Sequence, residues 1–267
     1  MNNYGIPQDA VITIAGTVGV GKSTLTEILS YLLATKYEKK VLVIDIDPQS
    51  DASKKLKRTF DKKIKPSRNI MDSILAMDLK PSIVSLHENL DLVHGDWDME
   101  DFTEHVISEF DKNARTYLLL NLIKPLKNEY DYIIFDTRPS TDIATKNAIC
   151  CSDYVLIATK TEESSAEGAR KTYNYVGSLV EFNPKVKLLG VLPYLDKPNS
   201  STSNRVKQEI IDQFQENVFN NIIKASDRVV TWGKFGITTD EPYDKKTLSM
   251  YINVIEEMFE RIKIMEG

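Results

Sequence analysis

The chain has 267 residues and a formal net charge of −5, with 42% hydrophobic and 27% charged residues. This composition is typical of a globular protein with a sizeable core, and it excludes disordered and fibrous architectures. No apolar run approaches the roughly 18 residues of a membrane span, and no basic patch followed by an apolar stretch opens the chain, so we expect a cytoplasmic protein without a membrane partner.

Short apolar runs rich in Val and Ile alternate with segments of helical spacing along most of the chain. Such runs suit strands buried on both faces of a parallel sheet. We expect strands at 11–15, 41–44, 132–135, 155–158 and 188–192, with further candidates at 90–93 and 218–223. Helical patterns cover 22–37, 69–78, 99–126, 142–150, 163–181, 202–215 and 244–264.

The alternation of strands and helices predicts an α/β fold with a doubly wound, mostly parallel sheet and helices on both faces. No internal repeat or Gly/Ser-rich linker divides the chain, so residues 1–267 are expected to form a single domain. The polar stretch 194–204 is expected to be a long exposed loop.

Residues 54–68 concentrate positive charge. This segment has eight basic residues and one acidic residue, so it carries +7 while the rest of the chain carries −12. Such a segment can attract phosphate backbones or an acidic protein surface. A solvated loop and helix face would explain the same residues, because basic runs are common on protein surfaces.

The strongest motif is GTVGVGKS at 16–23, which fits the P-loop pattern G-x-x-x-x-G-K-[ST]. Glycines let backbone N–H groups turn toward an anion, and the following helix directs its positive end at phosphates. Lys22 would supply charge to the β- and γ-phosphates, and Ser23 a hydroxyl to Mg²⁺. The predicted nucleotide-binding residues of the motif are Gly16, Thr17, Val18, Gly19, Val20, Gly21, Lys22 and Ser23.

A P-loop site also needs a carboxylate on a neighbouring strand to hold the water shell of the metal. Asp136 follows the apolar run 132–135 and meets this requirement, although a helix N-cap would also explain it. Asp45 and Asp47 follow another apolar run and share one side of the strand end by the period of two. Two carboxylates facing one way are expected beside Mg²⁺ and an attacking water.

These motifs and their order resemble the ParA branch of the ParA/MinD ATPases. VLVIDIDPQSDAS looks like the second nucleotide motif of that family, and YDYIIFDTRPS resembles its Walker B strand and switch. Further stretches that match are SDYVLIATKTEESSAEGA, with Asn147 before it, and LLGVLPYLDKPNSSTSNRV. Arg228 and the pair Phe235-Gly236 match positions near the carboxyl end of the family.

The resemblance implies a slow Mg²⁺-ATPase that acts as a switch. ATP would drive formation of a face-to-face homodimer that binds DNA without sequence preference, on the nucleoid. A centromere-binding, ParB-type partner would stimulate hydrolysis, and the cycle would segregate plasmids or chromosomes. By position, Lys22, Asp47 and Asp136 are the catalytic residues, Ser23 and Asp136 serve the metal, and Thr24 reaches the α-phosphate.

Two positions depart from the family pattern. Thr17 stands where the family has a P-loop lysine that reaches across the dimer, and a threonine supplies no charge there. Losing such a group at the transferring phosphate slows the reaction about 10³-fold or more. Arg138 stands where the family has proline. We hypothesise that Arg138 partly replaces the missing lysine at the γ-phosphate; a surface arginine after a strand is the alternative.

DNA contact in an acidic protein requires a localised basic face. One candidate lies in the 54–68 run, with Lys54, Lys55, Lys57 and Arg58; the other is a set in the carboxyl-terminal half, including Arg205, Lys224 and Arg228. The resemblance favours the second set. Two other functions stay open: a P-loop enzyme that transfers phosphate to, or ligates, a small molecule, and a weakly hydrolysing nucleotide switch protein.

Overall fold

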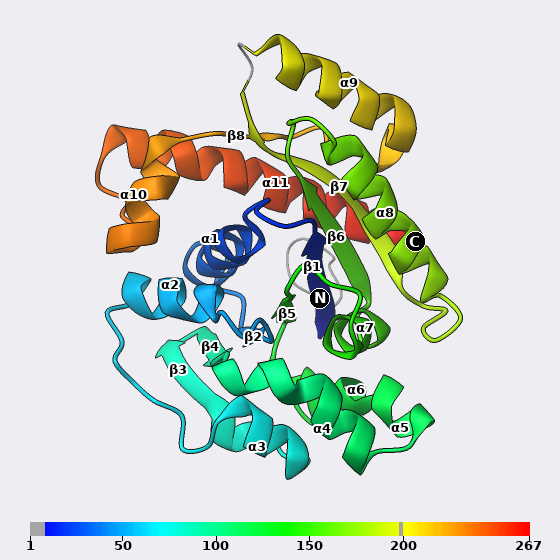
Figure 1. The fold of residues 1–267 in the computed structure, drawn as a ribbon. Coiled ribbons are helices and arrows are strands. Elements are labelled where there is room, and N and C mark those ends of the chain that lie inside the picture. The colour runs from blue at the N-terminus through cyan, green and yellow to red at the C-terminus, as the bar shows by residue number, and fades with distance from the viewer. Residues whose placement is uncertain (1–8, 198–199) are drawn as a thin grey trace.

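The computed structural model describes residues 9–197 and 200–267, which contain an eight-stranded sheet with helices on both faces (Figure 1). The strands run in the order β3-β4-β2-β5-β1-β6-β7-β8; only β3, at one edge, is antiparallel to its neighbour. Their bounds are β1 (Ala10–Gly16), β2 (Val41–Asp45), β3 (Ile83–His87), β4 (Leu90–Val93), β5 (Tyr132–Asp136), β6 (Tyr154–Thr159), β7 (Lys187–Asp196) and β8 (Ile223–Lys224). This topology confirms the doubly wound, mostly parallel α/β fold.

The helices cover both faces of the sheet (Figure 1). Strand β1 lies near the middle of the sheet, between β5 and β6. The bounds of the helices are α1 (Lys22–Thr35), α2 (Asp51–Thr59), α3 (Ile70–Leu75), α4 (Phe102–Glu109), α5 (Lys112–Thr116), α6 (Leu118–Ile123), α7 (Ile143–Cys150), α8 (Ser165–Ser178), α9 (Ser201–Phe214), α10 (Asp227–Phe235) and α11 (Pro242–Glu266). Within the described residues, no helix combines the length and apolar character needed to cross a membrane.

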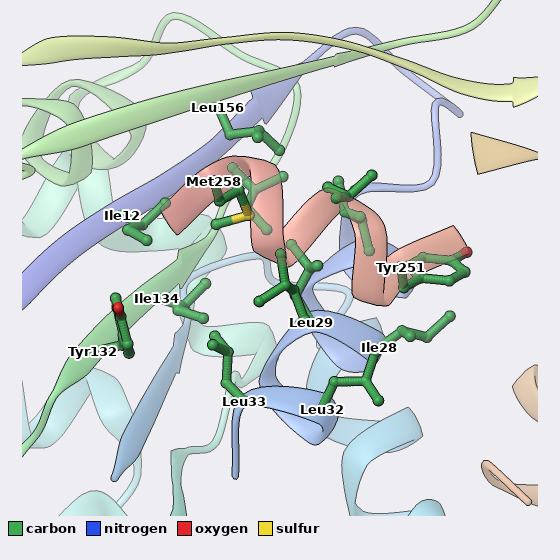
Figure 2. Packing of buried hydrophobic residues seen from close by; sticks show 14 of the residues in the cluster. Ile12, Ile28, Leu29, Leu32, Leu33, Tyr132, Ile134, Leu156, Tyr251 and Met258 are labelled. Atoms are coloured by element: carbon green, nitrogen blue, oxygen red, sulfur yellow. The ribbon is translucent and has the colours of Figure 1, made fainter. Parts of the chain in front are cut away.

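Alternate side chains of β1 enter separate cores because successive residues of a strand point to opposite faces. Ile12 and Ile14 pack with α1 and α11, whereas Val11 packs with the helices of the opposite face. Figure 2 shows Leu29 of α1 and Met258 of α11 turned toward one another above the sheet. Each such fully buried side chain contributes about 1.5–3 kcal/mol. This packing fixes α1 on the sheet and therefore fixes where its first turn lies.

The predicted helix at 99–126 is wrong, because the segment breaks into α4, α5 and α6. Asp111 accepts hydrogen bonds from the backbone N–H groups of Asn113 and Ala114, so it caps a new helix instead of continuing the previous one. The buried Asn147 of α7 fills the next break, where its side chain accepts from Leu119 N and donates to Arg115 O. Asn147 therefore has a structural role in this fold.

Two further expectations need correction. The segment 194–204 is mostly not a loop, because β7 runs to Asp196 and α9 begins at Ser201; residues 198–199 lie outside the described part. The predicted strand at 218–223 reduces to a single bridge between Val218 and Val191 and the two-residue β8. The sequence interpretation also missed β3, α2 and α10.

Candidate functional site

The P-loop joins the carboxyl end of β1 to α1, so its backbone surrounds the positive end of a long helix. Gly21 precedes α1 with a φ of +91°, a left-handed conformation that favours glycine. A Cβ at Gly21 would lie 2.7 Å from the ring of Tyr194, which packs beneath the loop. The glycine is thus required by both conformation and space, and it sets the entry of the chain into α1.

Lys22 is the first residue of α1 and folds back over the loop. Its ammonium donates hydrogen bonds to Gly16 O at 3.2 Å and to Thr17 O at 3.1 Å. Burial lowers the pKa of Lys22, and the negative charges of Asp136 and Asp47 oppose that effect. A buried ammonium whose hydrogen bonds within the described residues go to loop carbonyls suits a site for an anion, because phosphate oxygens are stronger acceptors for a cation than neutral carbonyls.

Asp136 lies at the end of β5, beside β1, and is fully buried. Its carboxylate accepts hydrogen bonds from Ser23 Oγ at 2.7 Å and Thr26 Oγ1 at 2.9 Å. Burial raises the pKa of Asp136, while these hydroxyls and the charge of Lys22 lower it. Thr26 escaped the sequence interpretation, although its position three residues after Ser23 places both hydroxyls on one helix face.

The oxygen atoms of Asp136 and Ser23 suit a Mg²⁺ ion that is bound together with a nucleotide. Mg²⁺ is usually held by one or two protein oxygens together with phosphates and waters. The described part of the chain has no cluster of three or more His, Cys, Asp or Glu that would form an all-protein metal cage. Ser23 and Asp136 would supply the hydroxyl and the carboxylate, and the bound metal would neutralise phosphate charge.

Asp45 does not face the site in the way that the strand period predicted. Its buried carboxylate accepts from Ser53 N at 2.9 Å and Ser53 Oγ at 2.7 Å, and from Asp47 N at 3.2 Å. Burial and the neighbouring Asp136 raise the pKa of Asp45. Asp45 therefore anchors the start of α2, whereas Asp47 lies beyond β2, half-buried, and acts electrostatically on Lys22.

Thr17 and Val18 form the outer part of the P-loop. The Thr17 methyl packs so closely on α8 that a Cβ at Gly168 would lie 2.6 Å from it. Val18 is 79% exposed. Both residues line a cavity of about 220 Å³ together with Arg138, but the Arg138 guanidinium forms salt bridges with Glu100 and Asp142. This pairing favours the alternative in which Arg138 is a surface arginine that follows a strand.

A second opening begins at Thr24, in the first turn of α1. We call it the nucleoside cleft; its volume is about 520 Å³, and its lining residues are Thr24, Lys55, Lys160, Glu162, Leu195, Lys197, Ala225, Ser226, Asp227, Val229, Val230 and Gly233. The cleft adjoins the P-loop helix at Thr24, and it shares no lining residue with the cavity beside Thr17. The sequence interpretation missed it because its lining comes from five separate segments.

The predicted DNA-binding residues separate in the structure. We call the opening between α2 and α10 the basic cleft; its volume is about 610 Å³, and it is lined by Lys54, Lys57, Arg58, Asp61, Lys62, Lys63, His94, Lys234 and Phe235. It joins three residues of the 54–58 set with Lys234 from the carboxyl-terminal half. Lys55 is not part of it, because its side chain lies in the nucleoside cleft.

The carboxyl-terminal candidates are less available. Arg205 is paired with Glu163 and Glu209 in exposed salt bridges. Arg228 is held by the buried Asp244, with its Nε 2.6 Å from the carboxylate, although it lines another cleft with Lys224. An arginine that already neutralises carboxylates offers less net charge to a phosphate backbone.

A phosphate loop at the end of the central strand, with a carboxylate from the neighbouring strand, defines the P-loop nucleoside triphosphatase fold. A family model described as an AAA domain matches residues 10–188. The chain belongs to this family, in its ParA-type branch of P-loop ATPases.

Similar proteins cover most of the chain. The chromosome partitioning protein ParA of Myxococcus xanthus is 29% identical over 225 residues, which cover 82% of this chain and 76% of that protein. The sporulation initiation inhibitor protein Soj of Bacillus subtilis is 28% identical over 216 residues, covering 79% and 82%. A structure from Borrelia burgdorferi bound to AMPPNP aligns with a TM-score of 0.76 at 27% identity, covering 94% of this chain and 98% of that chain.

Proposed function

We propose that this protein binds ATP with Mg²⁺, hydrolyses it slowly, and uses the cycle in plasmid or chromosome partition. The observation that carries the proposal is the arrangement of Lys22, Ser23 and Asp136: a buried ammonium folded over the phosphate loop, and a hydroxyl bonded to a buried carboxylate. Lys22 would bind the β- and γ-phosphates, and Asp136 would order the water shell of the metal through Ser23. Asp47, close enough to Lys22 to act on its charge, would orient the attacking water.

ATP titration calorimetry with Mg²⁺ tests the first part of this proposal. Wild type is expected to bind ATP, and Lys22→Met is expected to lose most of that affinity because it removes the phosphate cation. Wild-type protein that takes up no adenine nucleotide would refute the proposal.

Turnover is tested by measuring phosphate release with and without DNA. The same assay on Arg138→Ala tests the hypothesis that Arg138 acts at the γ-phosphate, and unchanged turnover argues against that hypothesis.

An ATP-dependent homodimer is the second part. The exposed Val18 and the adjoining Thr17 lie at the outer edge of the P-loop, where a second copy facing the nucleotide would cover them. Because Thr17 carries no charge, we expect the dimer to hydrolyse ATP more slowly than one with a lysine there. Size-exclusion chromatography of Asp47→Ala with ATP and Mg²⁺ should show a trapped dimer; monomers in both wild type and variant would refute dimerisation.

Sequence-independent DNA binding is the third part, on the nucleoid and in concert with a centromere-binding, ParB-type partner. The basic cleft supports it, because six cationic side chains meet there with one carboxylate, that of Asp61. Such binding should weaken steeply with salt, since phosphate contacts release counterions. Co-sedimentation with DNAs of unrelated sequence at two salt concentrations tests this; binding that survives high salt or prefers one sequence would contradict it.

A small-molecule kinase or ligase would need room for an acceptor beside the γ-phosphate. The cavity next to Thr17 has a volume of about 220 Å³, below the roughly 300–1,000 Å³ of typical ligand pockets. Nucleotide-dependent co-sedimentation with arbitrary DNA would favour the partition function over such an enzyme. Turnover distinguishes a partition ATPase from a nucleotide switch that hardly hydrolyses ATP. Addition of DNA and the partner should accelerate phosphate release in a partition ATPase and leave it unchanged in a passive switch.

A further inference from the structure

Lys55 turns away from the other cations of its helix. Lys54 and Lys57 line the basic cleft, but the Lys55 ammonium donates a hydrogen bond of 2.6 Å to Thr24 Oγ1 and lies in the nucleoside cleft. Thr24 is the third residue of α1. The Lys55 charge is therefore held against the first turn of the P-loop helix, and sequence order alone gave no sign of this.

A cation at this place is electrostatically unfavourable unless an anion joins it. The amino-terminal end of a helix carries partial positive charge, which destabilises a nearby cation by a few tenths of a kcal/mol or more. The first turn of α1 contains no acidic residue, and it already holds the ammonium of Lys22. Asp136 and Asp47 act on the charge of Lys22, and Glu162, which lines the cleft with Lys55, is paired with Lys160 and Lys197.

The surrounding carboxyl groups do not satisfy Lys55. Within the described part of the chain, its ammonium bonds to the Thr24 hydroxyl and forms no salt bridge. Glu27 is near enough for the Lys55 charge to act on it, but the carboxyl of Glu27 accepts its hydrogen bond from Thr59. The ammonium of Lys55 therefore remains able to bind an anion that enters the cleft.

The order of groups along α1 identifies that anion. In a P-loop site the lysine serves the β- and γ-phosphates, the following hydroxyl serves the metal, and the loop amides hold the α- and β-phosphates. Thr24 comes next, at the boundary between the phosphate loop and the nucleoside cleft. The group expected at this boundary is the phosphate that joins the chain of phosphates to the nucleoside, which is the α-phosphate.

We infer that Lys55 is a second nucleotide-binding cation, which contacts the α-phosphate of a nucleotide held by the P-loop. This inference rests on the proposed ATP binding. It gives the site two cations from one chain, Lys22 at one end of the triphosphate and Lys55 at the other. Because ADP and ATP share the α-phosphate, Lys55 strengthens the binding of both equally and does not act on the phosphate that leaves.

Titration calorimetry of ATP and ADP with Mg²⁺ tests the inference on Lys55→Met and on the control Lys263→Met, a lysine of equal charge at an exposed position of α11. Lys55→Met is expected to weaken both nucleotides by a similar factor of about tenfold or more, as removal of a charge-assisted hydrogen bond does. Lys263→Met should stay within about twofold of wild type. In steady-state turnover, KM for ATP should rise while kcat stays unchanged.

Lys55→Gln provides a second variant, because it can still donate a hydrogen bond to Thr24 but carries no charge. Lys55→Gln should lose nucleotide affinity to the same extent as Lys55→Met. Lys55→Arg, which keeps the positive charge, should retain most of the wild-type affinity. ATP and ADP affinities of Lys55→Gln within twofold of wild type would overturn the inference, and so would a loss for ATP alone. Wild-type protein that binds neither nucleotide would refute the proposed function itself and the inference with it.

Discussion

Glu27 of α1 is a buried carboxyl group whose ionisation opposes folding. Its side chain is 1% exposed; one oxygen accepts a hydrogen bond of 2.8 Å from Thr59 Oγ1, and Oε2 has no partner among the described residues. Burial raises the pKa of Glu27 from 4.5 to about 7, although the Thr59 hydroxyl and the charges of Lys55 and Arg58 act in the opposite direction.

This pKa defines the pH window in which stability changes. Below pH 4.5 the group is protonated in both the folded and the unfolded chain. As the pH rises from 4.5 to 7, the unfolded chain releases a proton that the folded chain retains, so the free energy of unfolding falls. A difference of this size corresponds to about 3 kcal/mol lost by the time the pH exceeds the folded pKa.

Glu27→Gln removes the ionisation and keeps an acceptor for Thr59. Urea unfolding should be measured between pH 5 and 8, a range that spans the folded pKa of about 7. As the pH rises, the free energy of unfolding of the variant should exceed that of wild type by up to about 3 kcal/mol. Glu260→Gln, at an exposed position of α11, is the control and should change little at any pH. A constant difference between Glu27→Gln and wild type across the range would refute the reasoning.

Three further predictions concern the site. Gly168→Ala should lower ATP affinity, measured by calorimetry, because the new Cβ would lie 2.6 Å from the Thr17 methyl. Gly177→Ala in the same helix meets nothing within 4 Å and should stabilise the protein by up to about 1 kcal/mol, measured by thermal melts. Asp136→Asn should abolish the gain in ATP affinity that Mg²⁺ gives over EDTA, and an undiminished gain would contradict the metal role. Lys62→Glu should weaken DNA binding and reduce its salt slope by about 1; an unchanged slope would remove Lys62 from the interface.

The central strands and the P-loop were predictable because their signals are local. Continuous apolar runs mark β2, β5 and β6, since strands covered on both faces need no polar side. The loop pattern at 16–23 and the carboxylate of Asp136 follow from the same strand–loop–helix geometry. Edge strand β3 was missed because it alternates buried and exposed residues over only five positions, Ile83–His87, and pairs with a four-residue neighbour.

Tertiary hydrogen bonds place two predicted side chains, those of Asp45 and Lys55, where local patterns did not indicate. Asp45 was expected beside the metal because of strand period, but the strand ends there and Ser53 captures its carboxylate. Lys55 was grouped with its basic neighbours, yet on a helix successive residues point about 100° apart, so it reaches Thr24 instead. No spacing rule reveals which distant group will meet such a side chain.

Helix α2 contributes side chains both to the nucleotide site and to the basic cleft. Its start is held by Asp45 and its middle by the hydrogen bond from Lys55 to Thr24. Its end is held by Thr59, which bonds to Glu27 of the P-loop helix and accepts from Ile237 N just after α10. One face of α2 thus contacts Thr24 and Glu27 of the P-loop helix, while its cationic side chains line the basic cleft. Since a packed helix moves as a unit, a ligand that shifts α2 through Lys55 also changes the position of Lys54, Lys57 and Arg58 relative to Lys234 of α10, and linkage makes that effect reciprocal.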